Sequence, residues 1–260
     1  MSQHVFITGA SRGIGLALAK SFLEQGWVVY LNSRSIDALK QAADQLNVPH
    51  ENLFPADLAK ESEREKLYQS IAERGIKIDC LVNNAGIGDY NPLTQASPDT
   101  VNTLLQLNIV ALTELSQFFA NAFKAVGKGW ILNVASTAAY TAGPGMASYF
   151  ASKAYVLSLS HALYYELKAH GVTVSVLCPG PTDTSFFEAA GIDHGALKHA
   201  PRMTSKSVAD IAIKGMLRGE KNIVPGLLNK LSVWLMNLSP RWLLQPLLAF
   251  LVNRQRQGSV

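Results

Sequence analysis

The chain has 260 residues, of which 48% are hydrophobic and 16% are charged, and its formal net charge is +4. Such a chain can bury a large core, which excludes an intrinsically disordered protein. Its two cysteines, Cys80 and Cys178, lie in or beside apolar runs, so we expect reduced, packed thiols and a cytoplasmic protein rather than a disulfide framework.

Short apolar runs alternate with longer helical patterns. The apolar runs do not alternate with polar residues, which predicts strands buried on both faces, at residues 4–8, 27–32, 52–56, 78–84, 130–136 and 172–179. Helical patterns occupy 14–25, 35–46, 61–74 and 101–126, and another begins near Tyr149. This order predicts right-handed βαβ units in a doubly wound, parallel α/β sheet of three layers. We expect a single domain over 1–224 and an extension over 225–260, with no secretory signal before the first strand.

The first predicted strand runs into the loop TGASRGIG and then into a helix. Glycines let a backbone approach a pyrophosphate closely, and a helix N-terminus supplies N–H donors. The candidate phosphate-binding residues are therefore Gly9, Ser11, Arg12, Gly13, Ile14 and Gly15. The spacing Gly-x-x-x-Gly-x-Gly differs from the commoner Gly-x-Gly-x-x-Gly, so a merely tight strand–helix turn is the alternative.

The second predicted strand ends at Ser33 and Arg34, where an NAD site usually presents a carboxylate to the ribose. No acid stands here, and Arg12 in the glycine loop is a second cation. Arginine bonds phosphate bidentately, so the two arginines favour NADP(H) over NAD(H). The alternative for Arg34 is a solvated surface residue.

Polar residues also follow the third and fourth predicted strands. Asp57, followed by Leu58, could accept from an adenine amino group or cap the next helix. In the run VNNAG, Asn83 and Asn84 could bond backbone across strands, while Ala85 and Gly86 leave room for a ribose. An ordinary Asn/Gly turn is the alternative.

Ser136 follows the fifth predicted strand, and Tyr149 and Lys153 stand four residues apart on the next helix. A phenol with its ordinary pKa near 10 is a poor base at neutral pH. A lysine on the same helix face would lower that pKa, so that the tyrosine could exchange a proton with a substrate oxygen that the serine orients. The Tyr–Lys pair alone is a common helical spacing.

Together these motifs, in this order, resemble the classical short-chain dehydrogenase/reductase family over roughly residues 4–225. The resemblance rests on Thr8–Gly15, NNAG at 83–86, Asn108, Ser136, Tyr149-x-x-x-Lys153 and the PG pair Pro179–Gly180. It implies a Rossmann-like fold with Tyr149 as general acid/base, Lys153 on the nicotinamide ribose, Ser136 on the substrate oxygen and Asn108 holding a relay water. It also implies that Thr182 or Thr184 bonds the carboxamide, and that helices holding 108–126 and 150–168 form a homodimer or homotetramer.

The segment 185–203 corresponds by position to the substrate lid of that family. Phe186 and Phe187, with Tyr140 and Met146 beside the catalytic residues, indicate an apolar substrate pocket, although these aromatics could simply pack the lid shut. His194 and His199 lack metal-ligand spacing, so no metal site is expected.

The last forty residues contain five of the 23 cations and no acid, so the preceding body is close to neutral. Leu227, Leu228, Leu231, Trp234, Leu235 and Leu238 share one helical face, and the longest uncharged run, 242–253, is too short to span a bilayer. This pattern fits a helix lying on an anionic membrane, or one packed on the domain or on a partner subunit. Cations interleaved with Leu and Trp argue against nucleic-acid binding.

The sequence therefore predicts an NADP(H)-dependent oxidoreductase that moves hydride between nicotinamide and a small-molecule carbonyl or secondary alcohol. The apolar lid and tail favour an acyl ketone or steroid-like substrate, because the tail resembles extensions on family members proposed to act on such molecules. Two alternatives remain: a binding or regulatory protein that retained the fold, and a peripheral membrane protein that works mainly through its tail.

Overall fold

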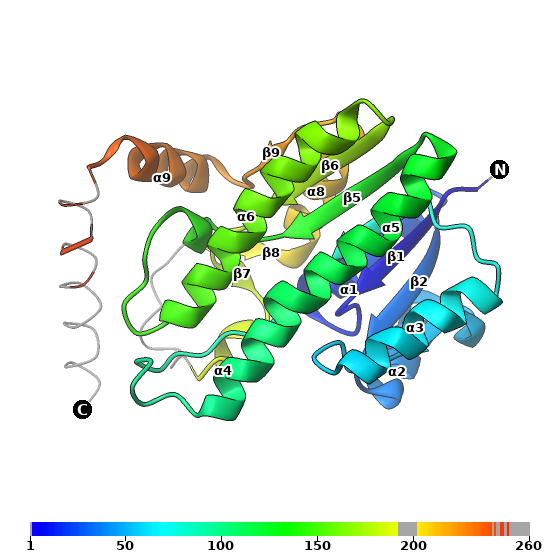
Figure 1. Ribbon diagram of the computed structural model, residues 1–260, viewed down its shortest axis with the longest axis horizontal. Coiled ribbons are helices and arrows are strands. Elements are labelled where there is room, and N and C mark those ends of the chain that lie inside the picture. Colours follow the sequence, from blue (N-terminus) through cyan, green and yellow to red (C-terminus); the bar gives the residue numbers. More distant parts are fainter. Residues whose placement is uncertain (1, 192–201, 241, 243–244, 247–248, 250–260) are drawn as a thin grey trace.

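Seven parallel strands form the main sheet, in the order β3-β2-β1-β4-β5-β6-β9 (Figure 1). The structure is a computed structural model that describes residues 2–191, 202–240, 242, 245–246 and 249. The strands of this sheet are β1 (His4–Thr8), β2 (Val28–Ser33), β3 (Leu53–Pro55), β4 (Cys80–Asn83), β5 (Gly129–Val134), β6 (Val172–Leu177) and β9 (Asn222–Ile223). The order reverses between β1 and β4, which is where a doubly wound sheet opens a crevice at its carboxyl edge.

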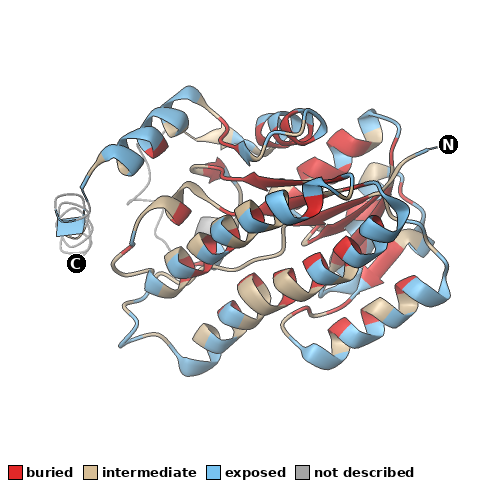
Figure 2. Cartoon of the chain, turned by 45° about the horizontal axis from the view of Figure 1, so that its top comes forward, coloured by how far each residue is buried: buried red, intermediate tan, exposed pale blue. Residues whose placement is uncertain are grey.

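Side chains of the central strands enter two separate cores, one on each face of the sheet. In β1, Val5 and Ile7 belong to one core and Phe6 to the other, and all three are fully buried. Figure 2 shows the same pattern as a band of buried strands between partly exposed helices. This two-sided burial explains why the strand sequences are continuously apolar.

Two sets of helices cover the two faces, giving the three predicted layers. The first core lies under α1 (Gly13–Glu24), α2 (Ile36–Leu46) and α8 (Ser205–Leu217). The second lies under α3 (Glu61–Glu73), α5 (Leu112–Val126) and α6 (Ala147–Lys168). The short helix η1 (His50–Asn52) leads into β3.

The single helical pattern predicted at 101–126 is three consecutive elements in the structure. α4 (Pro98–Leu105) passes into a π-helical turn, η2 (Gln106–Ala111), which continues as α5. A π-turn inserts extra backbone into a helix and is often found at functional sites. Here the turn contains Asn108.

Between β6 and α9 the structure contains elements that the sequence did not predict. These are the small parallel pair β7 (Thr182–Asp183) and β8 (Met203–Thr204), the short helix α7 (Phe186–Ala189), and then α8 and β9. β9 adds a seventh strand because Ile223 pairs beside Leu177 of β6 and is 2% exposed. A two-residue strand carries no periodicity of its own, which is why the prediction of six strands was incomplete.

The final described helix, α9 (Leu227–Leu238), packs on η3 (Thr137–Tyr140), the turn that follows Ser136. Figure 1 shows α9 beyond β9 and α6, at the end of the molecule opposite α2 and α3. In the described part of the chain no helix is both long enough and apolar enough to cross a membrane.

Candidate active site

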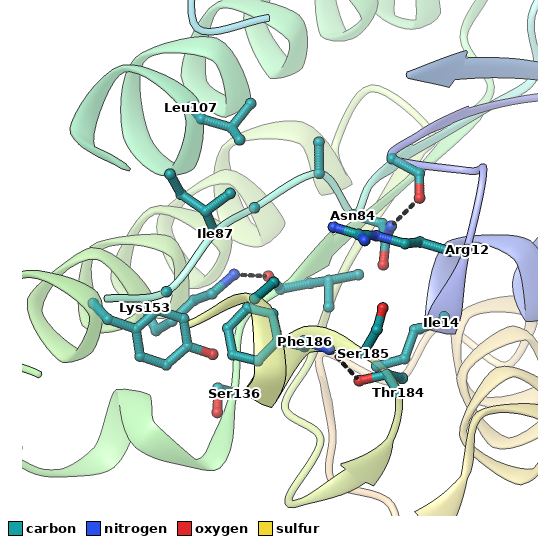
Figure 3. A pocket seen from close by; sticks show the side chains of 18 of the residues that line it. Arg12, Ile14, Asn84, Ile87, Leu107, Ser136, Lys153, Thr184, Ser185 and Phe186 are labelled. Carbon is teal, nitrogen blue, oxygen red and sulfur yellow. Dashed lines mark hydrogen bonds between the residues drawn. The ribbon is translucent and has the colours of Figure 1, made fainter. Parts of the chain in front are cut away.

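A cavity of about 650 Å³ opens along the carboxyl edge of the sheet, across the switch between β1 and β4. Figure 3 shows Arg12, Ile14 and Asn84 toward one side of it and Ser136, Lys153 and Phe186 toward the other. The volume lies in the usual range for small-molecule and cofactor sites. The predicted site residues that line this cavity are Gly9, Ser11, Arg12, Gly13, Ile14, Ser33, Arg34, Asp57, Leu58, Asn84, Ala85, Gly86, Ser136, Met146, Tyr149, Lys153, Pro179, Gly180, Thr182, Thr184 and Phe186.

The glycine loop between β1 and α1 forms one wall. Gly9 has φ +63°, a left-handed conformation that favours glycine. Gly15 is needed for close approach, because a Cβ there would lie 2.2 Å from the carbonyl oxygen of Gly9 and 2.5 Å from Nδ2 of Asn84. Gly15, which faces the loop rather than the cavity, is therefore explained by internal packing.

Thr8 and Asn84 clamp this loop to the end of β4. Asn84 donates from Nδ2 to the carbonyls of Thr8 (2.9 Å) and Gly9 (3.1 Å). The Thr8 hydroxyl accepts from the backbone N–H groups of Asn84 and Ala85, each at 3.0 Å. The cross-strand bonding expected of the Asn pair is thus present, since Asn83 also donates to Asn133 of β5 at 2.9 Å. The sequence did not predict that Thr8 bonds the end of β4. Only the position of Thr8 at the end of a strand could have indicated this role.

The end of the cavity near β2 and β3 is basic. Arg12 and Arg34 are both exposed there, and within the described residues neither forms an ion pair with a carboxylate. Asp57 is the one acid among the described lining residues. It is not the N-cap of α3, which begins after Lys60; its carboxylate instead accepts from the backbone N–H of Ala59 at 3.2 Å.

The opposite end holds the predicted Ser–Tyr–Lys group. Tyr149 and Lys153 lie in the first two turns of α6, and only 9% and 5% of their surfaces are exposed. The Lys153 ammonium donates to the carbonyl of Val134 at 2.9 Å and lies 5.8 Å from the centre of the Tyr149 ring. Ser136 accepts from the backbone N–H of Ala138 at 3.1 Å, which holds its hydroxyl at the start of η3.

Burial dominates the acid–base properties of this group. It raises the pKa of Tyr149 to about 12, and a hydrogen bond with the Ser136 side chain opposes that rise. It also lowers the pKa of Lys153 to about 8. Ser136, rather than Lys153, is thus the side chain that lowers the tyrosine pKa in this arrangement, so the effect expected of Lys153 stays a prediction.

Asn108 lies beside the cavity rather than on its lining. Its Oδ1 accepts from the N–H of Ile87 at 3.0 Å, and its Nδ2 donates to the carbonyl of Ile87 at 2.9 Å and to the hydroxyl of Ser152 at 3.0 Å. The Ser152 hydroxyl donates in turn to the carbonyl of Tyr149 at 2.7 Å. Asn108 therefore positions both the Ile87 wall of the cavity and the first turn of α6. Its predicted role in holding a water remains to be tested.

The substrate residues divide into two groups. Met146 and Phe186 line the cavity, and the Phe186 ring lies 5.5 Å from that of Tyr149, which makes this end apolar. Tyr140 does not line it; its hydroxyl bonds the Asn222 side chain at 2.7 Å and its ring packs on the core formed with Val224 and Val233. We therefore correct the placement of Tyr140, which joins η3 to β9.

Some predicted features of the lid lie outside the described residues. These are residues 192–201, with His194 and His199, and the side chain of Phe187, although the backbone of Phe187 is part of α7. Among the residues that the structure describes, no group of three or more His, Cys, Asp or Glu could hold a metal ion. The expectation of no metal stays a prediction.

The loop after β6 meets the C-terminal helix. Thr182 and Thr184 both line the cavity, and the Thr182 hydroxyl donates to the carbonyl of Gly180 at 3.0 Å. A Cβ on Gly180 would lie 2.3 Å from Oδ1 of Asn229 in α9. The sequence offered no signal for this contact, because it joins residues 49 positions apart without a motif at Asn229.

These features fit a nicotinamide dinucleotide. The N-cap of α1, Arg12, makes no side-chain bond to the first helical turn, so N–H groups of that turn are available to a pyrophosphate. Cations stand at one end of the cavity, and a tyrosine–lysine–serine group stands at the other. Such a fold and such a site define a dinucleotide-dependent oxidoreductase.

Comparison with known proteins identifies the family. The family model for short chain dehydrogenases matches residues 3–195, and the chain belongs to this family. The chain is 30% identical over 190 residues to the 3-oxoacyl-(acyl-carrier-protein) reductase of Salmonella typhimurium, covering 73% of this chain and 78% of the relative.

Two solved structures are similar over most of their lengths. A short-chain dehydrogenase from Sphingobium yanoikuyae in complex with NADPH is 30% identical, with a TM-score of 0.80, 92% of this chain covered and 96% of the other. A bulky-bulky ketone specific alcohol dehydrogenase from Comamonas testosteroni is 27% identical, with a TM-score of 0.75, 92% of this chain covered and 95% of the other.

Proposed function

We propose that this protein is an NADP(H)-dependent reductase of apolar ketones that also catalyses the reverse oxidation of the secondary alcohol. The observation that carries the proposal is one cavity lined at one end by the glycine loop and two arginines, which have no ion pair among the described residues, and at the other by Ser136 and the buried Tyr149 and Lys153. A regulatory protein that merely retained the fold would have no need to bury a lysine and a tyrosine together.

The cofactor proposal rests on charge. Arg34 and Arg12 would bond the 2′-phosphate, the glycine loop and the α1 N-terminus would hold the pyrophosphate, and Asp57 and Leu58 would border the adenine. Thr182 or Thr184 would bond the carboxamide. The NADPH held by the relative from Sphingobium yanoikuyae supports this choice over NAD(H).

The proton chemistry follows from the positions of the side chains. When bound, the nicotinamide supplies or accepts the hydride. Tyr149 gives its phenolic proton to the substrate oxygen during reduction, and Ser136 donates a hydrogen bond to the same oxygen. Lys153 would hold the ribose and stabilise the phenolate, and Asn108 would hold the water that restores the proton.

The substrate proposal rests on the apolar end of the cavity. Met146, Phe150 and Phe186 line the cavity, and the rings of Phe150 and Phe186 lie 6.1 and 5.5 Å from that of Tyr149. Relatives that reduce a 3-oxoacyl group and that accept bulky ketones support a substrate of this kind, such as an acyl ketone or a steroid-like ketone.

The mechanism is tested by replacing Tyr149 with Phe. We expect loss of turnover, by about a thousandfold or more, with NADPH affinity retained, because only the proton donor is removed. The matched control is Tyr155→Phe on the same helix, where the hydroxyl contacts Thr113 on the outside of the protein. NADPH oxidation across a panel of long acyl ketones and steroids is the measurement, and turnover by the Tyr149→Phe variant would refute the mechanism.

The cofactor preference is tested by replacing Arg34 with Ala. The Kd for NADPH should rise by about tenfold or more while the Kd for NADH stays the same, because a charge-assisted phosphate bond is removed. Arg218→Ala, an exposed arginine after α8 and outside the cavity lining, is the control. Equal effects on both cofactors would exclude a 2′-phosphate contact at Arg34.

The remaining proposals concern assembly and location. We propose that the protein forms a homodimer or homotetramer through the outer faces of α5 and α6. Light scattering would measure the mass of this assembly in solution. The two buried, unpaired thiols of Cys80 and Cys178 support a reducing compartment such as the cytoplasm.

A further inference from the structure

The helix α9 presents a continuous apolar surface to solvent. This surface, the α9 stripe, consists of side chains that are each 49–83% exposed: Leu227, Leu228, Leu231, Trp234, Leu235 and Leu238. With Trp242, these are seven of the fifteen exposed large hydrophobic residues in the described part of the chain. Figure 2 shows the outer side of α9 as almost wholly exposed. The spacing of the six residues places them on one face of the helix.

The opposite face of α9 fixes the direction in which the stripe points. Val233 is 6% exposed and belongs to the core that includes Val224 and Ala139. Asn229 donates to the carbonyl of Pro225 at 2.7 Å and packs against Gly180. The helix therefore cannot roll to bury its leucines against the body without breaking these contacts.

Charge distinguishes between the possible occupants of this surface. From Lys221 to the end, the sequence holds five cations and no acid, and Lys230 is an exposed residue of α9 itself. Two copies joined stripe to stripe would pair two α9 helices that each carry Lys230 and no carboxylate. Anionic lipid headgroups supply the opposite charge, and tryptophan suits the boundary between headgroups and acyl chains.

We propose that the α9 stripe is a membrane-docking surface that binds the enzyme to anionic lipid bilayers. The twelve-residue helix is too short to span a bilayer, so it lies in the plane of the interface with its leucines and tryptophan inserted. This proposal goes beyond the catalytic function and does not rest on it. Because α9 packs on η3, next to Ser136, docking brings the catalytic end of the cavity close to the lipid.

The test is co-sedimentation of the full chain with lipid vesicles. Binding is expected to vesicles of equal parts phosphatidylcholine and phosphatidylglycerol, to be weaker with phosphatidylcholine alone, and to fall as salt rises. The double variant Leu231→Glu/Trp234→Glu should partition at least about tenfold more weakly, because two inserted side chains become charged. Leu93→Glu/Leu217→Glu is the matched control, since these leucines are 58% and 42% exposed and lie outside α9, α5 and α6, and it should bind like the native chain.

Thermal unfolding and NADPH binding of each variant check that the fold is retained. No binding to anionic vesicles by the native chain, or equal binding by the Leu231→Glu/Trp234→Glu variant, would overturn the proposal. A native dimer that this variant dissociates, without vesicle binding, would assign the stripe to a second copy instead. Equal binding to both vesicle types at all salt concentrations would overturn the choice of an anionic surface.

Discussion

Burial has opposite consequences for the two ionisable side chains at the catalytic end. The pKa of Tyr149 is raised to about 12, so the phenol keeps its proton at neutral pH. The pKa of Lys153 is lowered to about 8, so its ammonium is charged at pH 7 and loses its charge in mildly alkaline solution. At neutral pH the chain is thus prepared to donate a proton rather than to accept one.

This protonation state predicts the pH dependence of the two directions. Reduction needs a protonated Tyr149 and should vary little between pH 6 and about pH 8, whereas oxidation needs the phenolate and should rise with pH. The measurement is kcat/KM for a ketone and its alcohol over this range and up to about pH 10. An alcohol oxidation rate that falls as pH rises would contradict the assignment of Tyr149.

The same burial predicts how stability depends on pH. Because the pKa of Lys153 is about 8 in the folded chain and near 10.5 when unfolded, the unfolded state binds more protons between these values. The free energy of unfolding should therefore gain about 3 kcal/mol from this group as pH rises through that window, and should lose it as pH falls through 8.

Urea unfolding of the native chain and of Lys153→Met at several pH values measures this effect. The stability difference between the two should shift in favour of the native chain as pH rises. Lys214→Met, at an exposed position of α8, should show no such trend. A pH-independent difference for Lys153→Met would show that the lysine is not buried as described.

Among the helices, α3 and α5 are joined by an ion pair that also supports the cavity. Arg64 is 2% exposed; it bonds both oxygens of Glu114, at 2.7 and 3.1 Å, and donates to the carbonyl of Leu58 at 2.9 Å. Leu58 and the adjacent Asp57 line the cavity. Arg64 is thus a positioning residue for the end of the site that would hold adenine.

Replacing Arg64 with Met should destabilise the fold by about 3 kcal/mol, because the Leu58 carbonyl and the Glu114 carboxylate lose their partner. This loss of stability lies at the lower end of the range for breaking a buried ion pair, because the Glu114 side chain is 38% exposed and partly solvated. Urea unfolding is the measurement, with Arg74→Met, an exposed arginine after α3, as the control. Equal effects of the two substitutions would refute the argument.

At the scale of the whole molecule, one of the contacts between α9 and the catalytic body reaches the cavity wall. The Asn229 carboxamide occupies the space that a Gly180 side chain would need, and Gly180 belongs to the cavity wall. A change on α9 can therefore move the loop that carries Thr182 and Thr184. The helix α9 is therefore part of the wall's support as well as an exposed surface.

This contact predicts a rescue experiment. Gly180→Ala should raise the KM for NADPH by several-fold or more, because its Cβ would lie 2.3 Å from Asn229 and displace the loop. The double variant Gly180→Ala/Asn229→Ala should recover most of the loss, since it removes the colliding atoms. If the double variant were as impaired as Gly180→Ala, the collision would not be the cause.

Neighbouring residues in the chain were enough to predict the layered parallel sheet and where its chemistry lies. Buried strands are continuously apolar, and parallel strands bring their carboxyl ends to one edge of the sheet. That Arg34, Ser136 and Tyr149 lie at one cavity could therefore be predicted without knowing how the elements pack. The family resemblance added the roles of these residues, because the motifs recur with fixed order and spacing.

Contacts between distant segments followed only from packing in three dimensions. The clamp of Thr8 on Asn84, the placement of Tyr140 on Asn222 and the collision of Gly180 with Asn229 join residues 49 to 82 positions apart. Such contacts depend on how helices and strands pack against each other. The pattern of apolar residues along a segment indicates only which of its side chains face a core, and not which distant residue each side chain meets. For this reason the clamp on the glycine loop, the support from α9 and the outward direction of its stripe emerged only from the folded chain.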